Sequence, residues 1–304
     1  MMPVKVHLLD GTYELFRHYH AVPSHITEDG REVAAIRGVL ESVLNLLSEV
    51  EVTHLGVATD HVIESFRNDM YHGYKTGEGI DPLLWAQFWP LEAALESMGV
   101  VVWPMVNFEA DDAMAAAAHL AAQDPTVDQV LILTPDKDLG QCVDGTRIVQ
   151  FDRRKRQLVD RQGVIEKFGV PPESIPDYLA LVGDTADGYP GLAGWGAKSA
   201  SAVLARYGHL EDIPDQAGQW DVPGLRGAQK LAATLVAGRA EAVLFRAIAT
   251  VDRECVTLPD GVEGLRWCGP RSDFEEVAKS FDGKSIAARA RALAESKAKR
   301  ALNH

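Results

Sequence analysis

The feature that most constrains the fold is an alternation of strand-like and helix-like segments over the first half of the chain. Short apolar runs typical of buried strands occur at residues 4–9, 54–59, 100–103 and 129–134. Segments with helical spacing of apolar residues separate them, at 34–50, 81–98 and 109–122. Strands that alternate with helices form a mainly parallel sheet flanked by helices. We therefore expect an α/β domain over residues 1–160.

Beyond that point the strand signals give way to helical ones. One short hairpin is expected at 147–159, with the basic run Arg153-Arg154-Lys155-Arg156 in it. Helices are expected at 161–168, 173–182, 197–207, 229–251 with a break near Gly238, 273–281 and 284–301. The second region, residues 161–304, is accordingly predicted to be helical.

Composition indicates an ordinary globular protein. Of 304 residues, 46% are hydrophobic and 24% charged, and there are three cysteines, which argues against a disordered, collagen-like or disulfide-stapled chain. The opening MMPVKVHLLDG reaches Asp10 too early for a signal sequence, and no apolar stretch approaches the ~20 residues of a membrane span. We expect a cytoplasmic protein that does not bind membranes.

The charge balance is acidic. Lys and Arg number 30 against 44 Asp and Glu, a formal net charge of −14, which taken alone speaks against a polyanionic partner. That inference is reversed if many of the acids surround bound cations, because a bound Mg²⁺ is often the largest local charge in a site. The positions of the carboxylates therefore decide the question.

Four of the acids follow predicted strands. Asp10, Asp60, Asp136 and Asp138 do so, and ligands of open α/β sheets bind outside the carboxyl ends of the strands. Glu109, Asp111 and Asp112 stand at a predicted helix start. Each alone is typical of helix capping or a turn. Together they favour a cation site, and hard oxygen ligands select Mg²⁺ or Mn²⁺.

A second chemically suggestive segment is GDTADGYPGLAGWGAKSA at 183–200. It supplies Asp184 and Asp187, and then glycines that run into a helix carrying Lys198. Glycines let backbone amides approach a phosphate at a helix N-terminus, and the lysine adds positive charge. The alternative is a glycine-rich turn without a ligand.

These segments resemble one family. The matching motifs are LLDGTYELFRHYHA (8–21), GREVAAIRG (30–38), SFRNDMYHGYK (65–75), FEADD (108–112), LTPDKDLGQ (133–141) and the 183–200 segment. In this order, over about two-thirds of the chain, the sequence resembles the 5′ nucleases: the 5′-to-3′ exonuclease domain of bacterial DNA polymerase I, phage 5′ exonucleases and flap endonucleases.

The resemblance implies a PIN-like nuclease domain over 1–160, followed by a helical region over 161–304 with a helix-three-turn-helix (helix-hairpin-helix) at about 178–207. It also implies two Mg²⁺ or Mn²⁺ ions, with K⁺ at the hairpin as a further candidate ion. The implied metal ligands are Asp10, Asp60, Glu109, Asp111, Asp112, Asp136, Asp138, Asp184 and Asp187. The implied DNA contacts are Gly191, Gly194, Gly196, Lys198 and Ser199.

The segment between the second strand and residue 81 resembles the base of the family's arch. Catalytic roles there are implied for Lys75, Arg67 and Tyr74, with Lys75 contacting a phosphate. The sequence departs from the family in three places. Glu78 stands where a basic residue is usual, and the segment 60–81 is acid-rich with little room for a basic helical arch. Asp187 is followed by Gly188 in place of asparagine.

The expected function is that of a stand-alone 5′-3′ exonuclease or structure-specific 5′ flap endonuclease. Two cations would promote hydrolysis of DNA phosphodiester bonds and leave 5′-phosphates. The expected partner is DNA with a 5′ end, nick or 5′ flap, bound by a monomer. Two alternatives stay open: a catalytically weak DNA-structure-binding protein of the same fold, and a PIN-type ribonuclease.

Overall fold

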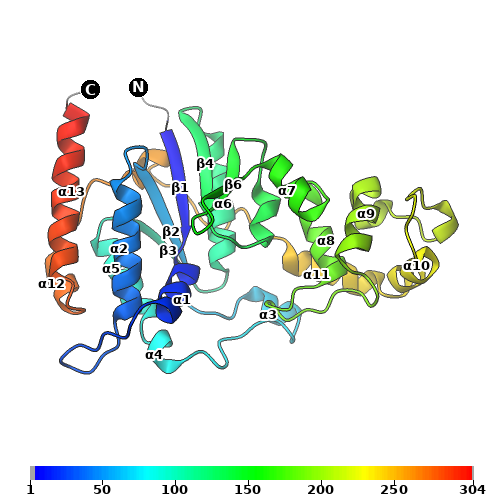
Figure 1. Cartoon of the computed structure of the whole chain (residues 1–304), viewed down its shortest axis with the longest axis horizontal. Coiled ribbons are helices and arrows are strands. Elements are labelled where there is room, and N and C mark those ends of the chain that lie inside the picture. The colour runs from blue at the N-terminus through cyan, green and yellow to red at the C-terminus, as the bar shows by residue number, and fades with distance from the viewer. Residues whose placement is uncertain (1–3, 303–304) are drawn as a thin grey trace. The chain divides into compact units, whose positions relative to one another are not determined.

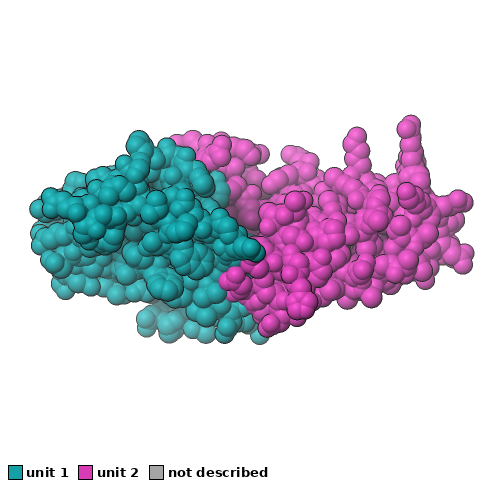
Figure 2. Space-filling view, turned by 90° about the horizontal axis from the view of Figure 1, so that it is seen from below, with its two compact units in different colours: residues 1–63, 77–133, 253–304 teal, residues 64–76, 134–252 magenta. Residues whose placement is uncertain are grey.

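The computed structural model describes residues 4–302, which form two compact units coloured separately in Figure 2. Unit 1 comprises residues 4–63, 77–133 and 253–302, and unit 2 comprises 64–76 and 134–252. Within the described residues, no helix is both long and apolar enough to cross a membrane.

Unit 1 is built on four parallel strands in the order β3-β2-β1-β4. They are β1 (Val4–Asp10), β2 (His54–Asp60), β3 (Val101–Met105) and β4 (Val127–Leu133). Leu8 on the central strand pairs with Gly56 on one side and Ile132 on the other, and it is fully buried. The predicted parallel sheet with flanking helices is confirmed.

The helices of unit 1 include one that the sequence pattern did not predict. They are α1 (Gly11–Ala21), α2 (Ala34–Ser48), α4 (Pro82–Trp85), α5 (Phe88–Ser97), α6 (Ala110–Gln123), α12 (Phe274–Lys279) and α13 (Lys284–Leu302). Helix α1 was missed because it buries only Gly11, Glu14 and Leu15, too few for an apolar stripe. A Cβ on Gly11 would lie 2.8 Å from Cγ1 of Val57, so α1 begins in close contact with β2.

The helix predicted at 81–98 is divided in two. Gln87 is almost fully buried between α4 and α5, its Nε2 donating to the carbonyl of Leu83 and its Oε1 accepting from the amide of Ile36. The amide side chain thus satisfies backbone groups where the two helices separate.

Unit 1 is assembled from segments that are far apart in the sequence. The last segment returns to unit 1, where α13 lies beside α2 (Figure 1). Arg289 of α13 donates to Asn45 Oδ1 of α2 at 2.6 Å, and the indole of Trp267 donates to the carbonyl of Met98 at 2.9 Å. These are contacts between residues more than 160 positions apart, which local patterns do not reveal.

Unit 2 is mainly helical, with one antiparallel hairpin. The hairpin consists of β5 (Ile148–Asp152) and β6 (Gln157–Val159), as predicted. The helices are α3 (Phe66–Met70), α7 (Arg161–Phe168), α8 (Ile175–Val182), α9 (Ala197–Tyr207), α10 (Ala228–Ala237) and α11 (Arg239–Ala249), with the 3-10 turn η1 (Asp138–Cys142). The bounds of α7 and α9 agree with the prediction, and α10 and α11 meet at Gly238. Leu179, Leu204 and Phe245 belong to their shared core.

Candidate active site

Three carboxylates of unit 2 come together at one point. Asp138, Asp184 and Asp187 each place one oxygen within 4.8 Å of the others. Asp138 begins η1, whereas Asp184 and Asp187 lie in the loop after α8. All three are predicted metal ligands, and the fold brings Asp138 to the other two across 46 and 49 positions of sequence.

Two glycines close the loop that carries Asp184 and Asp187. Gly183 and Gly191 have φ values of +84° and +67°, and a Cβ on Gly191 would lie 2.4 Å from the nitrogen of Gly183. Between them, Asp184 and Tyr189 form an antiparallel bridge with hydrogen bonds of 2.8 and 3.0 Å. The backbone contact with Gly183 is thus what requires glycine at 191, one of the predicted DNA contacts.

Gly188, which stands where the family has asparagine, is likewise required by a close backbone contact. Its φ is +85°, and a Cβ there would lie 2.2 Å from the carbonyl oxygen of Gly73. The amide of Lys75 donates to the carbonyl of Asp187 at 3.0 Å in the same contact. A side chain at 188 would separate these segments, so glycine replaces the family's asparagine where the chain approaches residues 73–75.

Two lysines form ion pairs with carboxylates of this cluster. Lys137 Nζ lies 2.6 Å from Asp184 Oδ2, and Lys75 Nζ lies 3.1 Å from Asp187 Oδ1. Burial by itself would lower the pKa of Lys137, but its hydrogen bond to Asp184 raises that pKa above the ordinary value. Lys137 was not predicted as a site residue, although its position between Asp136 and Asp138 was a signal that could have identified it.

Asp138 is the least satisfied member of the cluster. The residue is 7% exposed and its Oδ1 is buried without a hydrogen-bond partner. Burial, and then the charges of Asp136, Asp187 and Asp184, raise its pKa well above the ordinary range. A partnerless buried oxygen among carboxylates fits a divalent cation, which takes such hard oxygen ligands.

Asp136 lies at the edge of this cluster. It is exposed, and its Oδ1 accepts from the amide of Asp138 at 2.9 Å. Gln150 Nε2 donates to its carbonyl at 2.6 Å. These hydrogen bonds of Asp136 therefore stabilise the turn that leads to Asp138.

The other predicted ligands lie in unit 1, at the ends of β1 and β2 and at the start of α6. Asp10 Oδ1 accepts from the amide of Tyr13 at 2.8 Å, and Asp60 Oδ1 accepts from the amide of Ala110 at 2.8 Å. Glu109 and Asp112 form a capping box at the start of α6, with Asp111 half-buried between them. Asp10 and Asp60 end strands as predicted, and Glu109, Asp111 and Asp112 stand at a helix start as predicted. Asp10 and Glu109 also cap helices.

Arg67 and Tyr74 are buried, in contrast to Lys75. Arg67 is 2% exposed and donates through Nε and Nη2 to the carbonyls of Ile248 and Thr250, at the end of α11. Tyr74 belongs to the core of unit 2, with Lys75 Nζ 5.5 Å from its ring centroid. These contacts hold the segment that presents Lys75 to Asp187.

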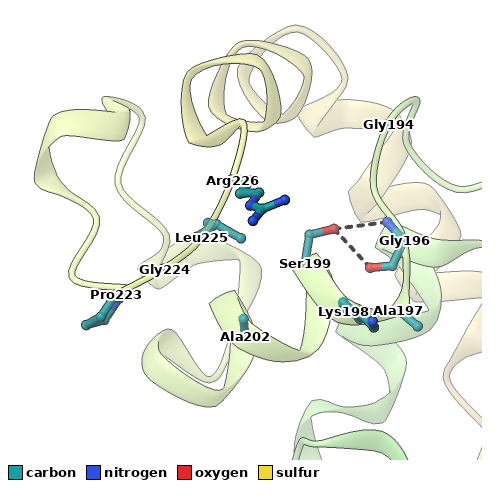
Figure 3. Close-up of a pocket in the computed structure, with 10 residues that line it drawn as sticks. All are labelled: Gly194, Gly196, Ala197, Lys198, Ser199, Ala202, Pro223, Gly224, Leu225 and Arg226. Carbon is teal, nitrogen blue, oxygen red and sulfur yellow. Dashed lines mark hydrogen bonds between the residues drawn. The ribbon is translucent and has the colours of Figure 1, made fainter.

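A separate hollow of about 710 Å³ opens at the start of α9 (Figure 3). Gly194, Gly196, Lys198 and Ser199 line it, all four of them predicted DNA contacts. Ser199 Oγ accepts from the amide of Gly196 and donates to its carbonyl, both at 3.0 Å, so it caps the helix. Arg226 extends into the hollow toward Ser199 and adds a second positive charge, which no sequence motif indicates.

Two family models match consecutive parts of the chain. The 5′-3′ exonuclease N-terminal resolvase-like domain matches residues 5–169, and the 5′-3′ exonuclease C-terminal SAM fold matches residues 170–273. The chain belongs to the 5′-3′ exonuclease family. The resemblance drawn from the sequence motifs is thereby confirmed, as are the resolvase-like, PIN-like α/β domain and the helical domain.

Relatives in this family include separate exonucleases and parts of polymerases. The chain is 34% identical to a 5′-3′ exonuclease of Aquifex aeolicus over 210 residues, covering 68% of this chain and 71% of that protein. It is 34% identical to DNA polymerase I of Pseudomonas aeruginosa over 255 residues, or 80% of this chain. That match spans only 27% of the polymerase.

Two solved structures share the fold. The T5 5′-exonuclease with bound zinc has a TM-score of 0.65 at 20% identity, over 94% of this chain and 99% of that chain. The catalytic core of Rad2 in complex with DNA substrate has a TM-score of 0.61 at 17% identity, over 96% and 93%. At these identities the likeness establishes the fold.

Proposed function

We propose that this member of the 5′-3′ exonuclease family is a divalent-metal-dependent nuclease. It hydrolyses phosphodiester bonds of DNA at a 5′ end, nick or 5′ flap and leaves 5′-phosphates. The observation that carries the proposal is the Asp138, Asp184 and Asp187 cluster, with its partnerless buried oxygen and its two lysines. The zinc-bound T5 exonuclease and the DNA-bound Rad2 core support the choice of ligand and substrate.

The residues divide into two ligand sets. Asp136, Asp138, Asp184 and Asp187 would hold one Mg²⁺ or Mn²⁺, and Asp10, Asp60, Glu109 and Asp111 the other, with Asp112 fixing the helix start beside them. When bound, such ions supply Lewis-acid activation of water and charge stabilisation at the phosphate. No side-chain nucleophile is required.

The remaining residues bind and orient the DNA. Lys75, whose Nζ lies 3.1 Å from Asp187 Oδ1, would contact the scissile phosphate beside the cation site. Arg67 and Tyr74 fix its backbone. Lys198 and Arg226, with the amides at Gly194 and Gly196, hold the duplex backbone, and a K⁺ ion at this hairpin belongs to the proposal.

The test is product analysis on matched substrates. Labelled duplexes with a recessed 5′ end, a nick or a 5′ flap, and an RNA version of each, are incubated with Mg²⁺, Mn²⁺ or chelator. We expect 5′-phosphorylated DNA products with either metal and none with chelator. Binding without cleavage would favour the structure-binding alternative, and preferential RNA cleavage would favour a ribonuclease. Gel filtration tests the monomer, and replacing K⁺ by Li⁺ in duplex binding tests the K⁺ site.

A further inference from the structure

Tyr189 is a buried phenol that the proposed mechanism does not use. It is 1% exposed, its ring stacks on Phe245 with centroids 5.6 Å apart, and its hydroxyl has no hydrogen-bond partner. An unsatisfied buried hydroxyl is costly, so its retention in a core position calls for an explanation.

The backbone places this phenol on the same side as a proposed ligand. Asp184 and Tyr189 face each other in an antiparallel bridge and exchange both backbone hydrogen bonds. Side chains of directly opposed residues project to the same face, with Cβ atoms about 5.5 Å apart. One carboxylate oxygen of Asp138 lies within 4.8 Å of one of Asp184. Asp138 and Tyr189 therefore lie on the same side of this bridge.

The two partnerless groups are complementary. Tyr189 has a donor without an acceptor, and Asp138 Oδ1 is an acceptor without a donor. Both are buried, and the carboxylates are close enough to act on the phenol electrostatically, that of Asp138 the most strongly. A buried water that bridges such groups, or a small rotation on cation binding, would satisfy both at once.

We propose that Tyr189 is a positioning residue for the cation site: its hydroxyl donates, directly or through one water, to the Asp138 carboxylate and fixes that ligand's orientation. This inference rests on the proposed function, because it assigns an outer partner to that same site. Outer partners of metal ligands typically contribute about 10- to 100-fold in metal affinity. The hydroxyl would thus stabilise the metal-bound protein more than the metal-free one.

The test compares Tyr189→Phe with wild type and with Tyr178→Phe, which removes a hydroxyl from another largely buried tyrosine of the same unit. Mn²⁺ affinity is measured by titration calorimetry without DNA, and melting temperature with chelator and with saturating Mn²⁺. We expect Tyr189→Phe to bind Mn²⁺ about tenfold more weakly. Its melting temperature in chelator should be no lower than that of wild type. Saturating Mn²⁺ should raise its melting temperature by less than it raises that of wild type. Tyr178→Phe should bind Mn²⁺ as wild type does.

Two results would overturn this role. Unchanged Mn²⁺ affinity in Tyr189→Phe would show that the phenol only fills the core, and an equal fall in melting temperature with and without metal would show the same. If wild type itself binds no Mn²⁺, the proposed cation site fails, which is a distinct result from an unaffected variant.

Discussion

Lys137 Nζ lies 2.6 Å from Asp184 Oδ2, inside the acidic cluster that we assign to a divalent cation. The ammonium group partly neutralises a carboxylate that the cation also needs. It therefore stabilises the metal-free protein and competes with the metal for the same oxygen.

Replacing Lys137 with methionine should separate these two effects. Lys137→Met keeps a linear side chain that is one atom shorter and removes its charge. Mn²⁺ should bind about tenfold more tightly, because a nearby positive charge is lost, while melting temperature in chelator should fall. Calorimetry and thermal unfolding measure both, with Lys279→Met in unit 1 as the control. Weaker Mn²⁺ binding in Lys137→Met would show that the lysine assists the site.

Asp138→Asn should change how metal-free stability depends on pH. The folded-state pKa of Asp138 is raised above its ordinary 3.8, so between these values the unfolded chain releases a proton that the folded chain retains. Wild-type stability in chelator therefore falls as pH rises above about 4. The variant lacks this fall and should be more stable by about 1 to 3 kcal/mol at neutral pH.

Urea unfolding in chelator from pH 4 to 8 checks this, with Asp128→Asn as a matched control outside the cluster. Parallel stability curves for wild type and Asp138→Asn would contradict the raised pKa. Saturating Mn²⁺ should reverse the order of stability, because asparagine is the weaker ligand.

Lys198→Ala and Arg226→Ala should each weaken duplex binding similarly for all sequences. Each loses about one phosphate contact, so the slope of log affinity against log salt should become shallower by about 0.9. The cleavage rate at saturating DNA should change little. Lys279→Ala, which removes an exposed charge of unit 1, provides the comparison. A large loss of saturated rate at unchanged affinity would instead place Lys198 or Arg226 in catalysis.

Glu78 should oppose long single-stranded flaps. It is exposed and stands three positions after Lys75, where the family usually has a basic residue. Glu78→Arg should increase the cleavage rate on long 5′ flaps, most clearly at low salt, and leave recessed 5′ ends nearly unaffected. Rates on both substrates across a salt series decide it, since an equal response on both would remove this role.

The sequence predicted elements whose signals are local. The bounds of α7 and α9 agree because each has clear capping residues, and Asp10 and Asp60 lie at strand ends because both follow short apolar runs. Helix α1 was missed because it buries few residues. The return of α13 to α2 depends on pairs such as Arg289 and Asn45, which no local pattern connects.

Only part of the site could be predicted, because some of its features depend on contacts between distant residues. The ligand residue types were evident from the motifs, but the roles of Gly188 and Gly191 depend on backbone contacts with Gly73 and Gly183. Arg226 joins Lys198 only through the packing of unit 2. In the sequence, Tyr189 has the features of an ordinary core residue. Only the structure shows that its buried hydroxyl has no hydrogen-bond partner.

The central claim is that the Asp138, Asp184 and Asp187 cluster binds a divalent cation that DNA hydrolysis requires. The most direct measurement is the rate of cleavage of a nicked duplex as Mn²⁺ is increased, for wild type and Asp184→Asn. We predict no cleavage in chelator, a saturable rise for wild type, and for Asp184→Asn a loss of at least about 100-fold. Wild-type cleavage that persists in excess chelator, or an Asp184→Asn curve that coincides with that of wild type, would contradict the account.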